Sequence, residues 1–254
     1  MPGFDVRAVD LAALNSLTKY PSIPTYHALD PANGSLTEQP VPFTGTVIGT
    51  EKVDGTNSRI IVLPDGSYLL GSREELLYAQ GDLIGNPALG IVQNLRPLAE
   101  TLAGARGDTI RVHYLELYGG RIGGQAKQYS TLGATGWRLF DVAVIDDLDE
   151  RLGWAPQRIS AWREGGGQSY LHEDELHEVG LDLTPRLFTV DAAELPPTIE
   201  GMHALLGERL PRTLVPLDGS GHGAAEGVVL RTADRSVIAK ARFQDYTRTL
   251  KRRR

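Results

Sequence analysis

The sequence predicts an α+β domain built on antiparallel sheets. Many short strand-like segments occur with helices scattered among them, and the two do not alternate regularly, which disfavours a doubly wound parallel sheet. Neither G-x-G-x-x-G nor G-x-x-x-x-G-K-[ST] occurs, so the two common nucleotide-binding loops are absent. With 254 residues, the chain can form one large domain or two small ones around a substantial core.

The first half of the chain is divided by prolines and tight turns. Prolines between residues 21 and 45 predict an extended, loop-rich segment after a short helix. Asp54-Gly55-Thr56 and Pro64-Asp65-Gly66 mark turns between strand-like runs. The expected elements are a helix within 10–20, strands at 46–52, 59–63 and 67–71, a helix at 89–102, and strands at 109–117 and 137–145.

The second half mixes helical and strand-like periodicity. A loop at 164–168 separates two short helical patterns, and Ala233-Asp234 predicts the turn of a hairpin. The expected elements are helices at 157–162, 173–179 and 202–210, a hairpin of strands 227–231 and 236–240, and a closing helix at 242–250.

Composition excludes several classes of protein. Hydrophobic content is 41% and charged content 23%, which is ordinary for a globular domain. No run of about 18 apolar residues occurs, as a membrane-spanning helix would need, and the N-terminal ten residues lack the apolar core of a signal peptide. Cysteine is absent, which excludes disulfides, thiolate nucleophiles and cysteine-bound zinc. We expect a cytoplasmic protein, although a chain without cysteine also tolerates export.

Charge is distributed unevenly along the chain. The net charge of −6 argues mildly against a nucleic-acid-binding protein, because phosphate contacts need lysine and arginine. The C-terminal fifteen residues are nevertheless strongly basic and contain a single acid, Asp245. This segment is either a solvated tail or a strip that contacts phosphates. Its cations are Lys240, Arg242, Arg248, Lys251, Arg252, Arg253 and Arg254.

The segment Glu51-Lys52-Val53-Asp54-Gly55-Thr56-Asn57 is the first candidate for chemistry. A lysine at the end of a strand-like run, directly before an Asp-Gly turn, is either the exposed end of a hairpin or a side chain held in a cleft. A lysine attacks phosphorus only as the neutral amine, so burial or neighbouring cations must favour loss of its proton.

Further segments accompany this lysine in a fixed order. Acids occur within apolar strand-like runs at Glu116, Asp141 and Glu226, where an unpaired carboxylate would be costly. Each is either a hydrogen-bonded structural acid or part of a site that binds a cation or ligand. The segments are Gly71-Ser72-Arg73, Tyr114-Leu115-Glu116-Leu117-Tyr118-Gly119, Leu139-Phe140-Asp141-Val142, Glu226-Gly227-Val228-Val229-Leu230-Arg231 and Ile238-Ala239-Lys240-Ala241-Arg242.

Together these segments resemble the motifs of the covalent nucleotidyltransferases, which comprise DNA ligases, RNA ligases and mRNA capping enzymes. The K-x-D-G-T-N form at Lys52–Asn57 is most similar to the RNA ligases. The resemblance extends from about Glu51 to Arg242. It implies an ATP-dependent ligase adenylation domain with antiparallel sheets, flanking helices and a nucleotide cleft between them.

The resemblance also implies a role for each matching residue. Lys52 would be the nucleophile that receives AMP. Glu116 would contact the ribose, Phe140 would stack on adenine, and Glu51 with its backbone would meet the base edge. Arg73 would hold the ribose or phosphate, Glu226 would place Mg²⁺ or Mn²⁺, and Lys240 and Arg242 would neutralise the phosphates.

Some of these assignments stay open. Asp54 is either a turn residue or a water-mediated metal contact, and Asn57 is either a turn cap or a contact to the 3′ end of a nucleic acid. Phe140 could instead pack in the core, and Lys240 and Arg242 could be an ordinary cationic strand end. Arg242 departs from the lysine common in the family, but it still supplies a fixed charge and paired donors. The histidines His27 and His113 are expected to be structural.

The implied reaction runs in three steps. Lys52 attacks the α-phosphorus of ATP and releases pyrophosphate, AMP passes to a 5′-phosphate, and a 3′-hydroxyl displaces AMP to seal an RNA strand. We expect residues 1–45 to be a lead-in and 46–254 to be the nucleotidyltransferase domain, with a possible insertion at 151–211 and no separate C-terminal domain. An accessory protein could then supply further contacts to the nucleic acid. The alternative is AMP transfer to another acceptor, such as a DNA nick, a protein or a small molecule.

Overall fold

The computed structural model describes residues 8–104 and 107–253. The predicted features at residues 1–7 and at Arg254 therefore lie outside the described residues. Within the described ranges, no helix is long and apolar enough to cross a membrane. The chain forms two compact units. Unit 1 comprises the residues up to Ser22, Thr56–Leu117 and Thr135–Leu181, and unit 2 comprises Ile23–Gly55, Tyr118–Ala134 and the residues from Asp182 onward.

Unit 1 is organised around a seven-stranded sheet. Its strand order is β10-β9-β8-β4-β5-β6-β7, and β4 pairs antiparallel with both β5 and β8. Because side chains alternate between the faces of a strand, the register of these pairs determines which residues share a face. The strands are β4 Thr56–Val62, β5 Tyr68–Ser72, β6 Leu76–Ala79, β7 Asp82–Leu83, β8 Ile110–Gly119, β9 Thr135–Ile145 and β10 Ser169–Tyr170.

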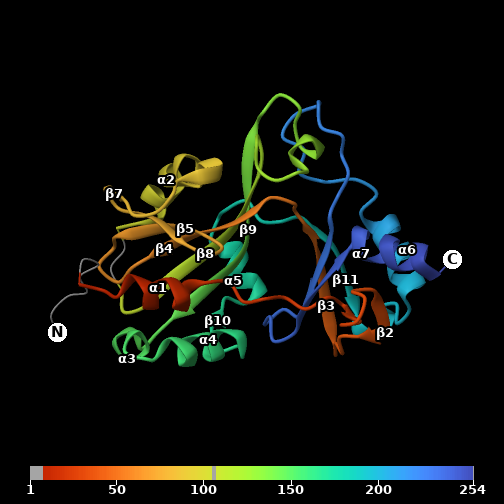
Figure 1. Cartoon of the computed structure of the whole chain (residues 1–254), viewed down its shortest axis with the longest axis horizontal. Coiled ribbons are helices and arrows are strands. Elements are labelled where there is room, and N and C mark those ends of the chain that lie inside the picture. The colour runs from red at the N-terminus through yellow and green to blue at the C-terminus, as the bar shows by residue number, and fades with distance from the viewer. Residues whose placement is uncertain (1–7, 105–106, 254) are drawn as a thin grey trace. The chain divides into compact units, whose positions relative to one another are not determined.

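Helices cover both faces of this sheet (Figure 1). The helix α2 packs against β5 and β4, and α1 lies on the opposite face, where Arg59 of β4 donates a hydrogen bond to the carbonyl of Asn15. Asp10 begins α1 by accepting hydrogen bonds from the backbone amides of Ala12 and Ala13. The helical segments are α1 Leu11–Thr18, η1 Ala88–Gly90, α2 Ile91–Leu102, α3 Leu148–Leu152, α4 Pro156–Glu164 and α5 Glu173–Glu178.

Unit 2 contains a four-stranded antiparallel sheet of order β11-β3-β12-β13 and a small sheet of β1 and β2. Its core gathers Val47, Val228, Leu230, Ala239 and Ala241 from the larger sheet against buried residues of α6 and α7. The elements are β1 His27–Leu29, β2 Leu36–Pro40, β3 Thr46–Lys52, η2 Ala126–Gln128, β11 Arg186–Asp191, η3 Ala192–Glu194, α6 Ile199–Arg209, β12 Gly227–Arg231, β13 Ile238–Arg242 and α7 Phe243–Arg253.

The predicted α+β class with antiparallel sheets is confirmed, and most predicted elements are present within a few residues. Two differences matter for function. The strands on either side of Asp54-Gly55 do not form a hairpin, because β3 belongs to the sheet of unit 2 and β4 to that of unit 1. The strand β11 was not predicted, yet it pairs with β3. It lies in the proposed insertion 151–211, which is divided between the two units at residue 181.

Candidate active site

Lys52 lies on one face of the four-stranded sheet together with both predicted cations. On neighbouring strands Lys52 is paired with Gly227, and Gly227 with Arg242. The adjacent row on the same face contains Thr50, Val229 and Lys240. Strands are spaced about 4.8 Å apart, so the backbones of Lys52 and Arg242 are separated by roughly two such spacings. The sheet register thus brings together residues that are almost 190 positions apart in sequence.

Glu226 is the acid that contacts the lysine. Its carboxylate lies 2.5 Å from the Nζ atom of Lys52, and the two side chains are 18% and 25% exposed. Burial raises the pKa of Glu226, and the negative charge of Asp54 acts in the same direction, while Lys52 and Arg242 oppose the shift. The pair is therefore a partly buried amine in contact with a carboxylate that holds a proton more tightly than an ordinary glutamate.

Gly227 explains why this face can be approached closely. A Cβ atom at Gly227 would lie 2.1 Å from the carbonyl oxygen of Ala241, far inside contact distance. Only glycine therefore fits between Lys52 and Arg242 in this register. The absence of a side chain also leaves the backbone open between two cationic residues, as the close approach of a phosphate would require.

The turn after Lys52 is held by a buried tyrosine that was not predicted. The phenolic oxygen of Tyr129 accepts a hydrogen bond of 2.6 Å from the backbone amide of Asp54. Tyr129 is fully buried and packs with Val53, Tyr118 and Val215. Burial raises its pKa, so the phenol stays neutral. The backbone directly after Lys52 is therefore fixed by a hydrogen bond to a buried side chain.

Glu51 anchors the other side of the lysine. Alternation places it on the face opposite Lys52, where its carboxylate accepts hydrogen bonds from the Thr213 hydroxyl (2.5 Å) and the Leu214 backbone amide (2.8 Å). The side chain is 1% exposed. The carboxylate is thus bonded to the loop before β12. The predicted contact of Glu51 and its neighbouring backbone to a base edge stays a prediction.

The predicted cations of β13 line a groove. Lys240 and Arg242 border a cavity of about 580 Å³ together with residues 23–25 and 39–42. Arg242 also donates from Nε to the buried carboxylate of Asp245 at 2.8 Å. This bond fixes the guanidinium while leaving its remaining donors for another ligand.

The other predicted residues lie in unit 1 on one face of its sheet. Asn57 and Glu116 are direct cross-strand partners on β4 and β8. Arg73 directly follows β5, where the register places it beside Asn57. The Oδ1 atom of Asn57 is buried and has no hydrogen-bond partner within the described part of the chain. A buried acceptor of this kind is costly to leave unpaired, which favours a ligand-binding role.

Phe140 belongs to an aromatic cluster. Its ring centroid lies 5.0 Å from that of Tyr20, in an edge-on arrangement, and 6.3 Å from that of Tyr114, on the same face as Glu116. It is half-buried. The neighbouring Asp141 is buried and accepts a 2.5 Å hydrogen bond from the Tyr20 hydroxyl, so the structural interpretation suits Asp141.

The two histidines have structural surroundings. His27 is buried, with its ring nitrogens 2.8 Å from the Tyr246 hydroxyl and 3.0 Å from the Pro197 carbonyl. His113 lies on the face of β8 opposite Glu116, and burial lowers its pKa to about 4. The expectation that both are structural agrees with this placement.

The donor set suits a divalent cation held mainly by substrate. Among the described residues, no three His, Asp or Glu side chains are grouped as a metal site. Glu226 and Asp54 do interact electrostatically. Mg²⁺ typically uses one or two protein carboxylates, with water and phosphate oxygens completing its shell. These two acids fit that arrangement, in which the metal binds together with a nucleotide.

The match to known proteins agrees with this geometry. Residues 45–248 match the RNA ligase family, and the chain belongs to that family. No curated protein sequence matches the chain at a significant level.

Solved RNA ligases of Naegleria gruberi share the fold. One, with ATP and manganese, has a TM-score of 0.52 and 15% identity over 93% of this chain and 62% of its own. Another with ATP and manganese has a TM-score of 0.50 and 17% identity over 82% and 52%. A third, with AMP and manganese, has a TM-score of 0.50 and 16% identity over 90% and 63%. This chain therefore spans between half and two thirds of their length.

Proposed function

We propose that the protein is an ATP-dependent RNA ligase-type nucleotidyltransferase that attaches AMP covalently to Lys52. The observation that carries the proposal is the placement of the Lys52–Glu226 pair on the same sheet face as Lys240 and Arg242. An amine, a carboxylate of raised pKa and two cations are the groups needed to bring a nucleophile to a phosphate and stabilise the charge that develops.

The first step forms one bond and breaks another. The Nζ atom of Lys52, once deprotonated, attacks the α-phosphorus of ATP, and the bond from that phosphorus to the β-phosphate oxygen breaks. Pyrophosphate leaves with the electron pair of this bond. Glu226 lies within hydrogen-bond reach of Nζ and would accept the proton that this nitrogen loses as the phosphorus–nitrogen bond forms. Lys240 and Arg242 would stabilise charge on the transferring and departing phosphates.

A divalent cation fits the same face. Glu226 and Asp54 would hold Mg²⁺ or Mn²⁺ together with phosphate oxygens, and the cation would supply Lewis acidity and charge neutralisation. In unit 1, Phe140 would stack on adenine, Glu116 would bind the ribose, and Arg73 and Asn57 would contact the ribose, phosphate or strand end. The unpaired Oδ1 atom of Asn57 supports this assignment.

The acceptor follows from the family. We propose that AMP passes to the 5′-phosphate of an RNA strand and that a 3′-hydroxyl then displaces it. An accessory protein could add further contacts to the nucleic acid. The alternative acceptors are a DNA nick, a protein or a small molecule. We keep the cytoplasm as the proposed location because the chain has no cysteine.

Self-adenylylation tests the proposal directly. The protein incubated with α-labelled ATP and Mg²⁺ should acquire an acid-stable label that Lys52→Ala abolishes. Lys127→Ala is the matched control, because Lys127 is an exposed lysine of the same unit, and it should label normally. Labelling of Lys52→Ala at the wild-type level would refute the assignment. GTP in place of ATP tests nucleotide choice, and 5′-phosphorylated nicked RNA, nicked DNA and single strands test the acceptor.

A further inference from the structure

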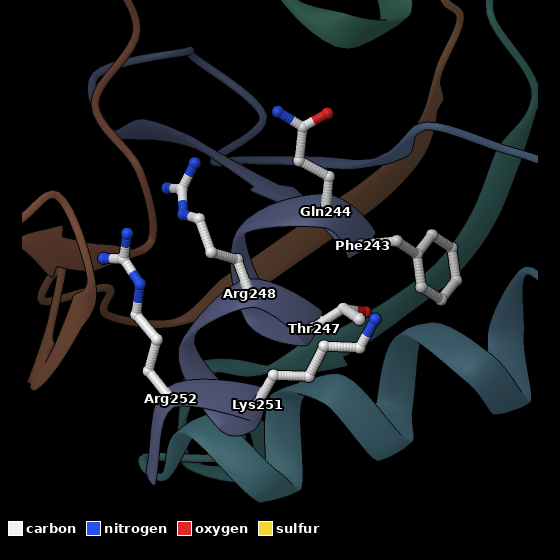
Figure 2. Close-up of a pocket in the computed structure, with 6 residues that line it drawn as sticks. All are labelled: Phe243, Gln244, Thr247, Arg248, Lys251 and Arg252. Atoms are coloured by element: carbon white, nitrogen blue, oxygen red, sulfur yellow. The ribbon is translucent and has the colours of Figure 1, made fainter.

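The outer face of α7 is basic and carries no acid. Phe243, Gln244, Thr247, Arg248, Lys251 and Arg252 line an open groove of about 560 Å³ along this helix (Figure 2). Three of the six are cations. The single acid of the helix, Asp245, is 1% exposed and already bonded to Arg242 and Arg248. Within the helix, Asp245 pairs with Arg248 but not with Lys251 or Arg252, so the acid of α7 does not neutralise these two cations.

The structure separates the cations of the C-terminal segment by role. Arg253 leaves α7 in a different direction and pairs with Glu38 at 2.7 Å and with Glu200 at 3.1 Å. Arg252 donates to the Asn33 carbonyl, which orients its guanidinium. Lys251 is exposed and has no ion pair among the residues that the structure describes. Of these three, Arg253 is structural, and Lys251 and Arg252 remain for a partner.

The spacing of the groups suits a strand of phosphates. Gln244, Arg248 and Arg252 recur every fourth residue, and so do Phe243, Thr247 and Lys251 (Figure 2). Each step of four residues advances about 6 Å along a helix. Gln244, Arg248 and Arg252 thus present donors at regular intervals. Thr247 and Lys251 continue the second row beside the half-buried ring of Phe243, one side of which packs against the core of unit 2. Cations beside an aromatic ring are typical of single-strand nucleic-acid binding.

The face also continues from the catalytic cations. Asp245 bonds to Arg242, the last residue of β13, and to Arg248 of the outer face. Its two carboxylate oxygens therefore bond both to Arg242, which shares a row of the sheet with Lys52, and to Arg248, the first cation of the groove. These residues all belong to unit 2.

We propose that the outer face of α7 binds the phosphodiester backbone of a single nucleic-acid strand and leads it toward the face of the sheet that carries Lys52. The inference rests on the proposed function, because it takes the bound strand to be the substrate of ligation. The contacts are to phosphates, so binding is independent of base sequence and falls with salt.

Binding to a fluorescent 5′-phosphorylated single strand, in RNA and DNA versions, tests the inference. The double variant Lys251→Gln with Arg252→Gln should bind the RNA strand and the DNA strand on the order of tenfold more weakly at low salt. It should also reduce the slope of log affinity against log salt concentration by about 2. Lys251→Gln alone should give an intermediate loss without removing any contact seen in the fold. Arg253→Gln is the matched control for Lys251→Gln: it removes one charge from the same helix turn, and should keep wild-type affinity and slope.

Self-adenylylation of Lys52 is measured in the same variants, so that failure of the binding proposal can be told from failure of the proposed function. All three variants should self-adenylylate at the wild-type rate, which also reports that they are folded. Undiminished binding by the double variant, an equal loss in Arg253→Gln, or a wild-type protein that binds neither strand would overturn the inference while labelling persists. Failure of the wild-type protein to label would refute the proposed function and leave the binding result to be judged by itself.

Discussion

Glu226 contacts Lys52, and in the proposed mechanism it both holds this amine and accepts its proton. Its carboxylate contacts Lys52 at 2.5 Å, yet it is buried enough that its pKa is raised. Burial strengthens its basicity, and the nearby lysine and arginine keep that effect limited. The neighbouring Gly227 leaves open the space that a side chain would fill. The contact, the burial and the raised pKa all belong to one side chain, so a single substitution at Glu226 tests its proposed role.

We expect Glu226→Gln to reduce the rate of self-adenylylation by about 10²–10⁴, because the amide keeps the shape of the side chain but cannot accept the amine's proton. Single-turnover labelling with saturating ATP and Mg²⁺ measures this rate. Glu208→Gln, which alters an acid on α6 that is 70% exposed, should label like the wild type. A Glu226→Gln protein of undiminished rate would exclude this carboxylate from the reaction.

His113 predicts a pH dependence of stability. Burial lowers its pKa to about 4 in the folded protein, against roughly 6.5 when unfolded. Between these values the unfolded chain binds more protons, so stability falls as pH decreases. At pH 5 the loss is about 2 kcal/mol relative to pH 7.5.

Urea unfolding at both pH values measures this difference for the wild type and for His113→Leu. The variant should lose about 2 kcal/mol less on acidification. Equal losses in the two proteins would contradict the assignment of this pH dependence to His113.

At the scale of elements, two loops hold the lysine strand from either side. One supplies Tyr129, whose hydroxyl receives the Asp54 amide, and the other supplies Thr213 and Leu214, which bind Glu51. The loops are themselves joined, since the Leu217 amide donates to the Tyr129 carbonyl. The backbone around Lys52 is thus hydrogen-bonded to elements that contribute no group to the proposed reaction, and we propose that Tyr129 acts as a positioning residue.

Tyr129→Phe should leave the fold intact and slow the chemical step. The ring keeps its packing, but the Asp54 amide loses its acceptor, at a cost of about 1–3 kcal/mol. We expect a lower maximal rate of labelling with little change in the ATP concentration for half-saturation. Tyr118→Phe is the control, because Tyr118 lies in the same apolar cluster, whereas the Asp54 amide donates to the hydroxyl of Tyr129. Equal rates in the two variants would count against positioning by Tyr129.

At the scale of the whole molecule, the predicted site residues are divided between two units. Unit 2 carries Lys52, Asp54, Glu226 and the two cations of β13, and unit 1 carries Asn57, Arg73, Glu116 and Phe140. The chain passes from one unit to the other directly after Gly55. The proposal therefore assigns the reacting groups to one unit and the recognition of adenosine to the other.

This division predicts different kinetic defects. Phe140→Leu preserves an apolar side chain against Tyr20 and removes base stacking, which is worth about 1–3 kcal/mol. It should raise the ATP concentration for half-maximal labelling about tenfold and leave the maximal rate nearly unchanged. Arg242→Gln should instead lower the maximal rate. Measuring the labelling rate against ATP concentration for both variants separates a change in half-saturating concentration from a change in maximal rate. An unchanged half-saturating ATP concentration in Phe140→Leu would remove adenine stacking from the proposal.

Local sequence alone determined a large part of this description. Alternation and turn residues predicted β3, β12 and β13 closely, and the ordered motifs indicated the RNA ligase family and the residues around Lys52. The predicted strands follow from neighbouring residues, because strand periodicity and Asp-Gly turns act over a few positions. The family followed instead from the resemblance of the ordered motifs.

Only the tertiary structure showed which distant residues meet. The pairing of Glu226 with Lys52, the support of Asp54 by Tyr129, the bonds of Glu51 to the 213–214 loop and the placement of β11 beside β3 are long-range contacts. It also separated Arg253 from the basic outer face of α7. Sheet register and burial decide these contacts, and both depend on packing across the folded chain rather than on the residues adjacent in sequence.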